Sequence, residues 1–317
     1  MGWRWAYGWK EITLEVNVKR VLKWIGLGLL VLVGIIVVGG AVLHFVGKSR
    51  LENAPEVATH PVTVLADETA VAHGEHLVNV VSQCYFCHGE QLEGSLFFDG
   101  ELGSYLAAPN LTGGQGGIGA TYSDADWERA LRHGIGGDNR VLVIMPSNFY
   151  AHYSDADLGA IIAYLKQVPP VDSEWEPRRM GFPGTVVGGV LGFDEFTRIN
   201  GIDHEAVGRE SPPEGVTAEY GQYLVNIAMC GECHAANLAG VVGADGPPPG
   251  PNLTPGGELG GWTEADFINT IRTGQTPSGR QLDGEQMPWP AFSQMSDTEL
   301  QAIWVYLHSL PALADNP

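Results

Sequence analysis

The sequence CYFCH at residues 84–88 decides the architecture of the chain, and it returns as CGECH at residues 230–234. In a C-x-x-C-H motif the two thiols lie one helical turn apart, so both can add to the vinyl groups of one porphyrin. The adjacent imidazole can then bind the porphyrin iron. We therefore predict two covalently attached haem c groups, held by Cys84, Cys87 and His88 and by Cys230, Cys233 and His234.

All four cysteines of the 317-residue chain lie within these two motifs. None remains for a disulfide framework or a zinc site, so cysteine usage does not report the redox compartment. The net charge is -20, and from Leu51 onward 10 Lys and Arg face 35 Asp and Glu. Such a surface excludes nucleic acid as a partner and favours a basic redox protein. Acidity that merely keeps the protein soluble explains the charge equally well.

A charge-free apolar segment lies near the N-terminus, from Ile25 to Phe45. At about 1.5 Å per residue it spans roughly 30 Å, enough to cross a bilayer. We predict an uncleaved transmembrane signal anchor at 25–46, preceded by a cytoplasmic N-terminal tail at 1–24 and followed by a tether at 47–69. Five of the seven nearby basic residues precede the segment. This bias predicts a single-pass protein of the bacterial inner membrane, with its N-terminus cytoplasmic and its haem domains periplasmic.

The similarity between the two copies extends well beyond the haem motifs. Residues 74–80 match residues 221–227, and each segment predicts a helix whose glycine allows another helix to approach closely. A Pro-Asn-Leu-Thr sequence follows each motif, and 35 positions separate its asparagine from a Met-Pro pair in both copies, Asn110 to Met145 and Asn252 to Met287.

Capping residues predict two further helices in each copy. The middle helices should begin after Ser123 and Thr263 and stop at Gly134 and Gly274. The closing helices should begin after a capping serine, and we place them at Asp155–Gln167, after Ser154, and at Asp297–Ser309, after Ser296.

With these motifs in place, the sequence resembles the class I cytochrome c family over about residues 70–313. It is more similar still to the multi-haem cytochrome c subunits of membrane-bound bacterial alcohol and sugar dehydrogenases, which carry three haem domains where this chain has two. The resemblance implies an all-α fold, in which the transmembrane helix is followed by two tandem cytochrome c domains at 70–170 and 218–313. It also implies that the carbonyls of Pro109 and Pro251 accept the Nδ1 hydrogens of the haem-binding histidines.

On one face of each haem the iron ligand is predicted to be His88 or His234, respectively. Attachment of the adjacent cysteine holds each imidazole next to the iron. For the opposite face we favour Met145 and Met287, since each precedes a proline at the same repeat position. The alternatives are His133 or His152 for the first haem and Met295 or His308 for the second. Neither His133 nor His308 recurs in the other copy.

Residues 171–217 form an interdomain linker with an apolar run from Phe182 to Phe193. The run is too short for a second membrane span. Long structureless loops are uncommon within compact proteins, so the linker should drape over one or both domains or present an apolar surface to another subunit.

If protein side chains fill both axial positions of each haem iron, no open site remains for a substrate. The sequence therefore predicts electron transfer rather than catalysis. Thioether ligation raises the potential, so electrons would pass from a quinol-oxidising or dehydrogenase complex to a terminal acceptor such as an oxidase. The chain would act as a mobile carrier or as a permanent subunit of a respiratory or photosynthetic complex. The alternative is a dihaem enzyme, a peroxidase or a sulfur-compound dehydrogenase, which would need one open iron.

Overall fold

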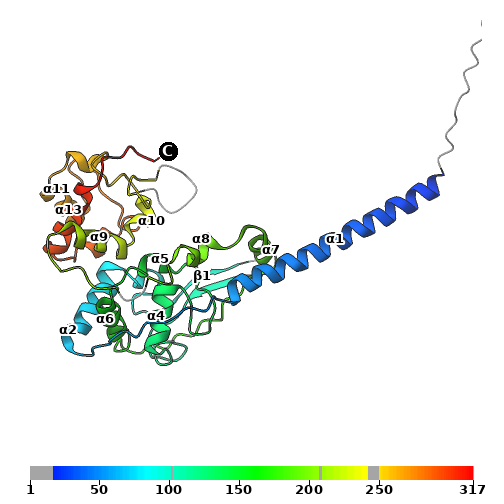
Figure 1. Cartoon of the computed structure of the whole chain (residues 1–317), viewed down its shortest axis with the longest axis horizontal. Helices are drawn as coiled ribbons and strands as arrows, with labels where there is room; N and C mark the ends of the chain where they lie inside the picture. Colours follow the sequence, from blue (N-terminus) through cyan, green and yellow to red (C-terminus); the bar gives the residue numbers. More distant parts are fainter. Residues whose placement is uncertain (1–16, 101–102, 207–208, 242–249, 317) are drawn as a thin grey trace, which may run out of the picture.

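The computed structural model describes residues 17–100, 103–206, 209–241 and 250–316, and it is mostly helical. Helix α1 (Val18–Glu52) projects from the remainder of the molecule (Figure 1). It begins at Asn17, whose side chain accepts a hydrogen bond from the backbone N–H of Arg20, and it is long and apolar enough to cross a membrane. The predicted cytoplasmic tail falls largely outside the described residues.

The predicted tether at 47–69 is wrong at its beginning, because α1 continues through Glu52. The end of the helix is docked on the first haem-motif unit. Leu51 is buried, and its carbonyl accepts hydrogen bonds from the backbone N–H of Val141 and from the Arg178 side chain. Only the residues beyond this point run as an extended connection to the next helix.

Two units follow α1, and their α-helices occur in the same order, although their short helical turns differ. The first contains α2 (Glu68–His76), the π-helical turn η1 (Leu77–Val81), α3 (Tyr85–His88), α4 (Asp124–His133), α5 (Ser147–Tyr150) and α6 (Asp155–Leu165). The second contains α9 (Ala218–Ile227), α10 (Cys230–His234), the 3-10 turn η4 (Glu258–Gly261), α11 (Glu264–Thr273), α12 (Trp289–Phe292) and α13 (Asp297–Ser309).

In each unit the first and last helices cross at a glycine, as the repeat predicts. A Cβ on Gly74 would lie 2.0 Å from the Ala160 carbonyl oxygen, and a Cβ on Gly221 would lie 2.0 Å from that of Ala302. Only glycine lets the α2–α6 and α9–α13 backbones approach this closely.

The predicted helix signals are confirmed. Ser123 and Thr263 form capping boxes, and Ser154 and Ser296 cap the closing helices. Gly134 and Gly274 end α4 and α11 in the left-handed conformation. Helix α6 ends two residues earlier than expected, within the usual variation of helix ends.

The predicted all-α fold is incomplete, because the first unit also contains a two-stranded antiparallel sheet. Strands β1 (Ser95–Asp99) and β2 (Tyr105–Ala108) pair within the loop that is four residues longer in the first copy than in the second. Tyr105 also forms a β-bridge with Arg179 of the linker. The extra loop length therefore folds as a local hairpin held partly by the linker.

The linker drapes over the first unit. Trp175 Nε1 donates to the Glu93 carbonyl at 2.9 Å, and the Arg178 guanidinium donates to the carbonyl oxygens of Val141 and Leu51. Three short elements follow: α7 (Phe182–Leu191), which packs on α1, α8 (Asp194–Thr197) and the 3-10 turn η3 (Ile199–Gly201).

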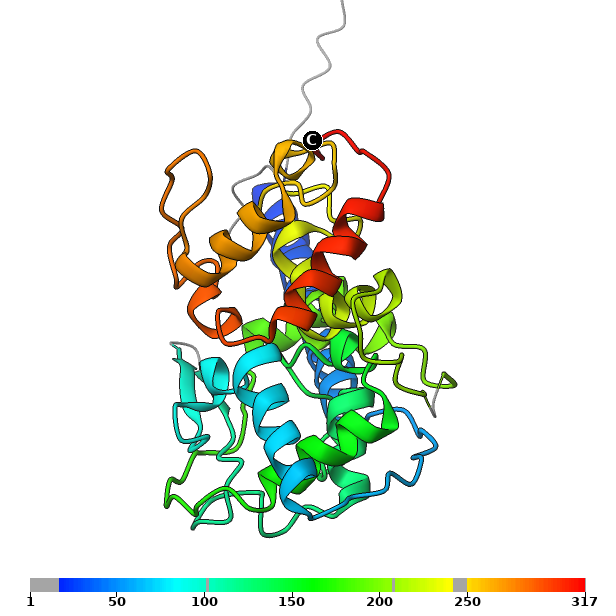
Figure 2. The same ribbon diagram turned by 90° about the vertical axis from the view of Figure 1, so that its left-hand side faces the viewer.

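The two units stack directly on each other, with the second (yellow to red) above the first (cyan to green) in Figure 2. One hydrophobic cluster runs through both units. Polar contacts join them as well: His76 Nε2 lies 2.9 Å from Glu299 Oε1, and Tyr223 donates to the Asp157 carboxylate, which also binds His73.

Candidate haem-binding site

Each C-x-x-C-H motif folds as a single helical turn. In the first, the backbone N–H of His88 donates to the Cys84 carbonyl at 2.9 Å. Both cysteines and the histidine therefore lie on one helical turn. The residue before each motif has a left-handed backbone, with φ of 48° at Gln83 and 56° at Met229. Non-glycine residues seldom adopt this conformation, and its recurrence indicates that the surrounding fold imposes it on the attachment turn.

Both histidines are oriented by a backbone carbonyl. His88 Nδ1 lies 2.9 Å from the Pro109 carbonyl oxygen, and His234 Nδ1 lies 2.7 Å from that of Pro251. Because a carbonyl oxygen can only accept, Nδ1 must carry the hydrogen, which leaves the Nε2 lone pair available to a metal. Burial lowers the pKa of both imidazoles, so they are neutral at physiological pH.

The first cysteine of each motif is half-buried, and its thiol is neutral in the protein without haem. Burial raises the pKa of Cys84 to about 12 and that of Cys230 to about 12. A catalytic thiolate needs a lowered pKa, so these positions do not suit cysteine nucleophiles. They suit thioether formation at a buried porphyrin edge.

The Pro-Asn-Leu-Thr sequence positions the carbonyl that orients each histidine. The fully buried Asn110 donates to the Val171 carbonyl at 2.7 Å and accepts from the Thr112 backbone N–H at 2.9 Å. Asn252 likewise donates to the Leu313 carbonyl at 2.8 Å. The asparagine thus ties the loop to the chain leaving the closing helix, a role that the sequence pattern marks by repetition but does not explain.

The two predicted methionine ligands lie at equivalent places. Met145 precedes α5 and Met287 precedes α12, and both half-buried side chains pack against the hydrophobic cluster that also borders Cys84 and Cys230. All four of these side chains therefore border the same cluster.

The alternative ligands are occupied elsewhere or buried. Both nitrogens of His133 face other side chains, with Nδ1 2.9 Å from His204 Nδ1 and Nε2 3.4 Å from Glu128 Oε1. His308 stacks on Trp304 with ring centroids 4.6 Å apart.

The remaining two alternatives are His152 and Met295. His152 Nδ1 lies 3.4 Å from an Arg209 nitrogen. Met295 is 2% exposed and packs in the hydrophobic cluster, so it stays an alternative to Met287 for the second haem.

An unpaired buried donor supports a haem in the first unit. Trp127 is 2% exposed, and its Nε1 has no hydrogen-bond partner among the described residues. A buried N–H without a partner is costly, and a haem propionate is an acceptor of suitable chemistry. Phe267 occupies the equivalent position in the second unit and has no such donor. With the oriented histidines and half-buried cysteines, the residues present fit haem c.

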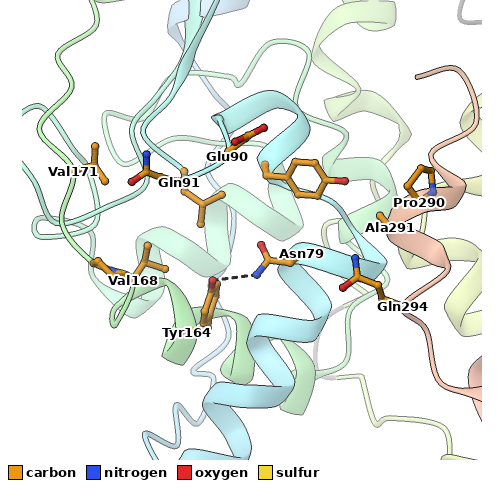
Figure 3. Close-up of a pocket in the computed structure, with 12 residues that line it drawn as sticks. Asn79, Glu90, Gln91, Tyr164, Val168, Val171, Pro290, Ala291 and Gln294 are labelled. Carbon is orange, nitrogen blue, oxygen red and sulfur yellow. Dashed lines mark hydrogen bonds between the residues drawn. The ribbon is translucent and has the colours of Figure 1, made fainter. Parts of the chain in front are cut away.

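The second residue of each motif lies near the short helix that follows the Met-Pro pair of the other unit, which is α5 in the first unit and α12 in the second. A Cβ on Gly231 would lie 3.5 Å from the Phe149 ring of α5. In the other direction, Tyr85 lines a pocket of about 510 Å³ together with Pro290 and Ala291 of α12 (Figure 3). Both haem motifs therefore border the interface between the two units.

Comparison with known proteins matches each unit to a cytochrome family. Residues 71–169 match the family model described as cytochrome c, and residues 216–307 match that of cytochrome c oxidase, cbb3-type, subunit III. A dihaem cytochrome c-type protein of Cereibacter sphaeroides is 30% identical over 214 residues, covering 62% of this chain and 68% of the relative.

Two further relatives are subunits of dehydrogenases. The fructose dehydrogenase cytochrome subunit of Gluconobacter japonicus is 27% identical over 81% of this chain, and the quinone alcohol dehydrogenase cytochrome c subunit of Gluconobacter oxydans is 29% identical over 79%. The chain spans 56% of the length of each. Taken together with the duplicated attachment turns, these similarities show that the chain belongs to the cytochrome c family of electron-transfer proteins, which bind haem c covalently.

Proposed function

We propose that the protein is a membrane-anchored dihaem cytochrome c that relays single electrons. His88 and Met145 would hold one haem iron, and His234 and Met287 the other. Reversible one-electron chemistry is what haem c supplies when bound. The chain contributes the oriented imidazoles, the thioether ligands and a buried surrounding, with the carbonyls of Pro109 and Pro251 fixing the tautomers.

The reciprocal contact between the units is the observation that carries the relay. Gly231 of the second attachment turn lies beside Phe149 of α5, and in the other direction α12 packs on η1, the turn that leads into the first motif. Transfer between two redox centres within one protein needs a fixed, close arrangement of the two sites. A single hydrophobic cluster through both units supplies that rigidity.

The proposed partners are membrane-bound redox proteins. The relatives named as dehydrogenase cytochrome subunits support a dehydrogenase or quinol-oxidising complex as the donor and a terminal acceptor such as an oxidase. The basic residues before the apolar segment of α1 support an N-terminus in the cytoplasm and haem units in the periplasm of a bacterial inner membrane. The protein would belong to a respiratory or photosynthetic chain, and its acidic surface would favour a basic partner.

Purification from native membranes in mild detergent tests this function. We expect two low-spin haems per chain, no binding of carbon monoxide, and copurification with a dehydrogenase or quinol-oxidising complex if the chain is a permanent subunit. Recovery of the protein alone would make it a mobile carrier. A high-spin haem at rest, or a carbon monoxide complex, would contradict two closed irons and favour a dihaem enzyme.

Methionine variants test the ligands. Met145→Ala and Met287→Ala should each convert one haem to the high-spin state and remove its sulfur-to-iron charge-transfer band. Met295→Leu is the matched control, because Met295 is a buried methionine in the second unit and leucine conserves its volume. If Met287→Ala leaves the spectrum unchanged and Met295→Leu alters it, the assignment of Met287 is refuted.

A further inference from the structure

Helix α7 has an apolar surface that faces away from the protein. No charged residue occurs from Gly181 to Phe193. Val187 is 54% exposed, Val190 61% and Leu191 78%. Side chains of this kind, gathered on one short helix, are unusual on a surface that faces water.

Helix α7 packs against the end of α1 through glycines. A Cβ on Gly47 would lie 1.9 Å from the Thr185 carbonyl oxygen, and a Cβ on Gly189 would lie 2.2 Å from that of Leu43. Backbones that meet this closely at small residues are typical of helix pairs within membranes, where no hydrophobic effect drives one helix onto another.

The polar groups at this contact satisfy one another. His44 interrupts the apolar segment of α1, and its Nδ1 lies 2.6 Å from Oγ1 of Thr185, which is 2% exposed. At the C-terminal end of α7, Arg50 donates to the Gly188 carbonyl at 2.7 Å. Because hydrocarbon offers no hydrogen-bond partners, polar groups at membrane depth must be paired within the protein.

The position of the contact along α1 sets its depth. The charge-free segment of α1 ends at Lys48, while Phe182 lies against Gly40, with its ring 3.7 Å from a Cβ built there. At about 1.5 Å per residue, Gly40 lies about 12 Å before Lys48 along the helix axis. A membrane that covers the apolar part of α1 would therefore also cover the beginning of α7. With ten residues, α7 is too short to span a bilayer.

We propose that α7 is embedded in the membrane leaflet next to the haem units, with Val187, Val190 and Leu191 against lipid acyl chains. This inference rests on the proposed membrane anchoring by α1, whose exposed apolar surface continues into that of α7. Two packed helices, rather than one on a flexible tether, would then hold the haem units at a fixed distance and orientation above the bilayer.

Spin labelling of the full-length holoprotein tests the position of α7. Since all four native cysteines are consumed by haem attachment, a Leu191→Cys variant carries one reactive thiol. The protein is placed in phosphatidylethanolamine–phosphatidylglycerol nanodiscs with its haems oxidised, because reductants of haem also destroy the nitroxide. Each collision value is taken as the difference from a nitrogen-equilibrated sample, which removes the relaxation caused by the iron. Collision of the label with oxygen, which concentrates in lipid, is compared with collision with a water-soluble nickel chelate.

Two matched variants calibrate the result: Ile36→Cys in the middle of α1 and Gln167→Cys at an exposed position of the first unit. The label at position 191 should have nickel collision several-fold lower than at 167 and above that at 36, because α7 contacts α1 near the end of its apolar segment. Nickel collision equal to that at 167 would overturn the proposal, as would protection from both reagents, which would indicate a protein partner. A water-accessible label at 36 would overturn the membrane anchor itself and this inference with it.

Discussion

The backbone of Ala235 provides a sensitive test of how the two haem turns are built. Ala235 directly follows the second motif and has φ 64° and ψ 159°, a region that is essentially reserved for glycine. The equivalent residue of the first copy is Gly89, with φ 83° and ψ 158°. The second unit therefore keeps the glycine conformation without the glycine.

The Ala235→Gly substitution should stabilise the second unit. A residue held in this region costs about 1–3 kcal/mol. Glycine in turn gives the unfolded chain more freedom, which costs about 0.4–1 kcal/mol. The free energy of unfolding should therefore rise by about 1–2 kcal/mol. For a unit of this size, each kcal/mol raises the melting temperature by about 4–8 °C.

Thermal unfolding of the holoprotein, followed by circular dichroism, measures this change. Gly89→Ala is the reciprocal variant and should lower the stability of the first unit. Its loss should be of similar size, because the Glu93 carboxylate that a Cβ at Gly89 would meet at 2.5 Å is the end of a flexible side chain that can move away. If Ala235→Gly destabilises the protein, or if Gly89→Ala has no effect, the argument that this backbone is strained fails.

Three further variants probe the helix crossing, the ion pair and the contact between the haem motifs. Gly221→Ala should destabilise the second unit by more than 1–3 kcal/mol, about the cost of ordinary overpacking, since its methyl group would overlap the Ala302 carbonyl; denaturant unfolding measures this. The hydrogen bond that His73 donates to the Asp157 carboxylate raises the pKa of His73. The stability that His73 contributes is therefore full below about pH 6.5 and is lost as the pH rises through its folded pKa, and His73→Gln should flatten this part of the pH profile of the melting temperature. Phe149→Ala should slow electron exchange between the haems while leaving both low-spin, as observed by rapid reduction followed in the Soret band; an unchanged rate would exclude the α5 contact from the relay.

The local features of the fold could be predicted because they are encoded by nearby residues and occur twice. Ser123 and Thr263 cap their helices through their own side chains, and Gly74 and Gly221 mark a helix crossing by having no side chain. The resemblance to class I cytochromes also implied the hydrogen bond from His88 to Pro109, which the structure shows. Duplication made these signals clearer, since residues of the same type recur at the capping and helix-crossing positions of both copies.

The features that could not be predicted depend on contacts between distant segments. The β1–β2 hairpin lies in a loop that is four residues longer in the first copy than in the second, and it is completed by Arg179 from the linker. The left-handed backbone at Gln83 and Met229 is imposed by the attachment turn on residues with no preference for it. No local pattern distinguishes such residues from ordinary loop positions, because the free energy that offsets their strain comes from the packing of the whole unit.

The packing of α7 on α1 shows how such a distant contact changes the meaning of a local pattern. The sequence presents Phe182–Phe193 as a glycine-rich apolar run too short to span a membrane, and it presents His44 as an isolated polar residue in an anchor. The structure pairs them: Thr185 reaches His44, and the glycines of each helix accommodate the backbone of the other. The apolar run, for which another subunit was one predicted partner, therefore packs on α1 of its own chain. The side of it left exposed is continuous with the surface that α1 presents to lipid, so the linker between the two haem units also orients them above the membrane.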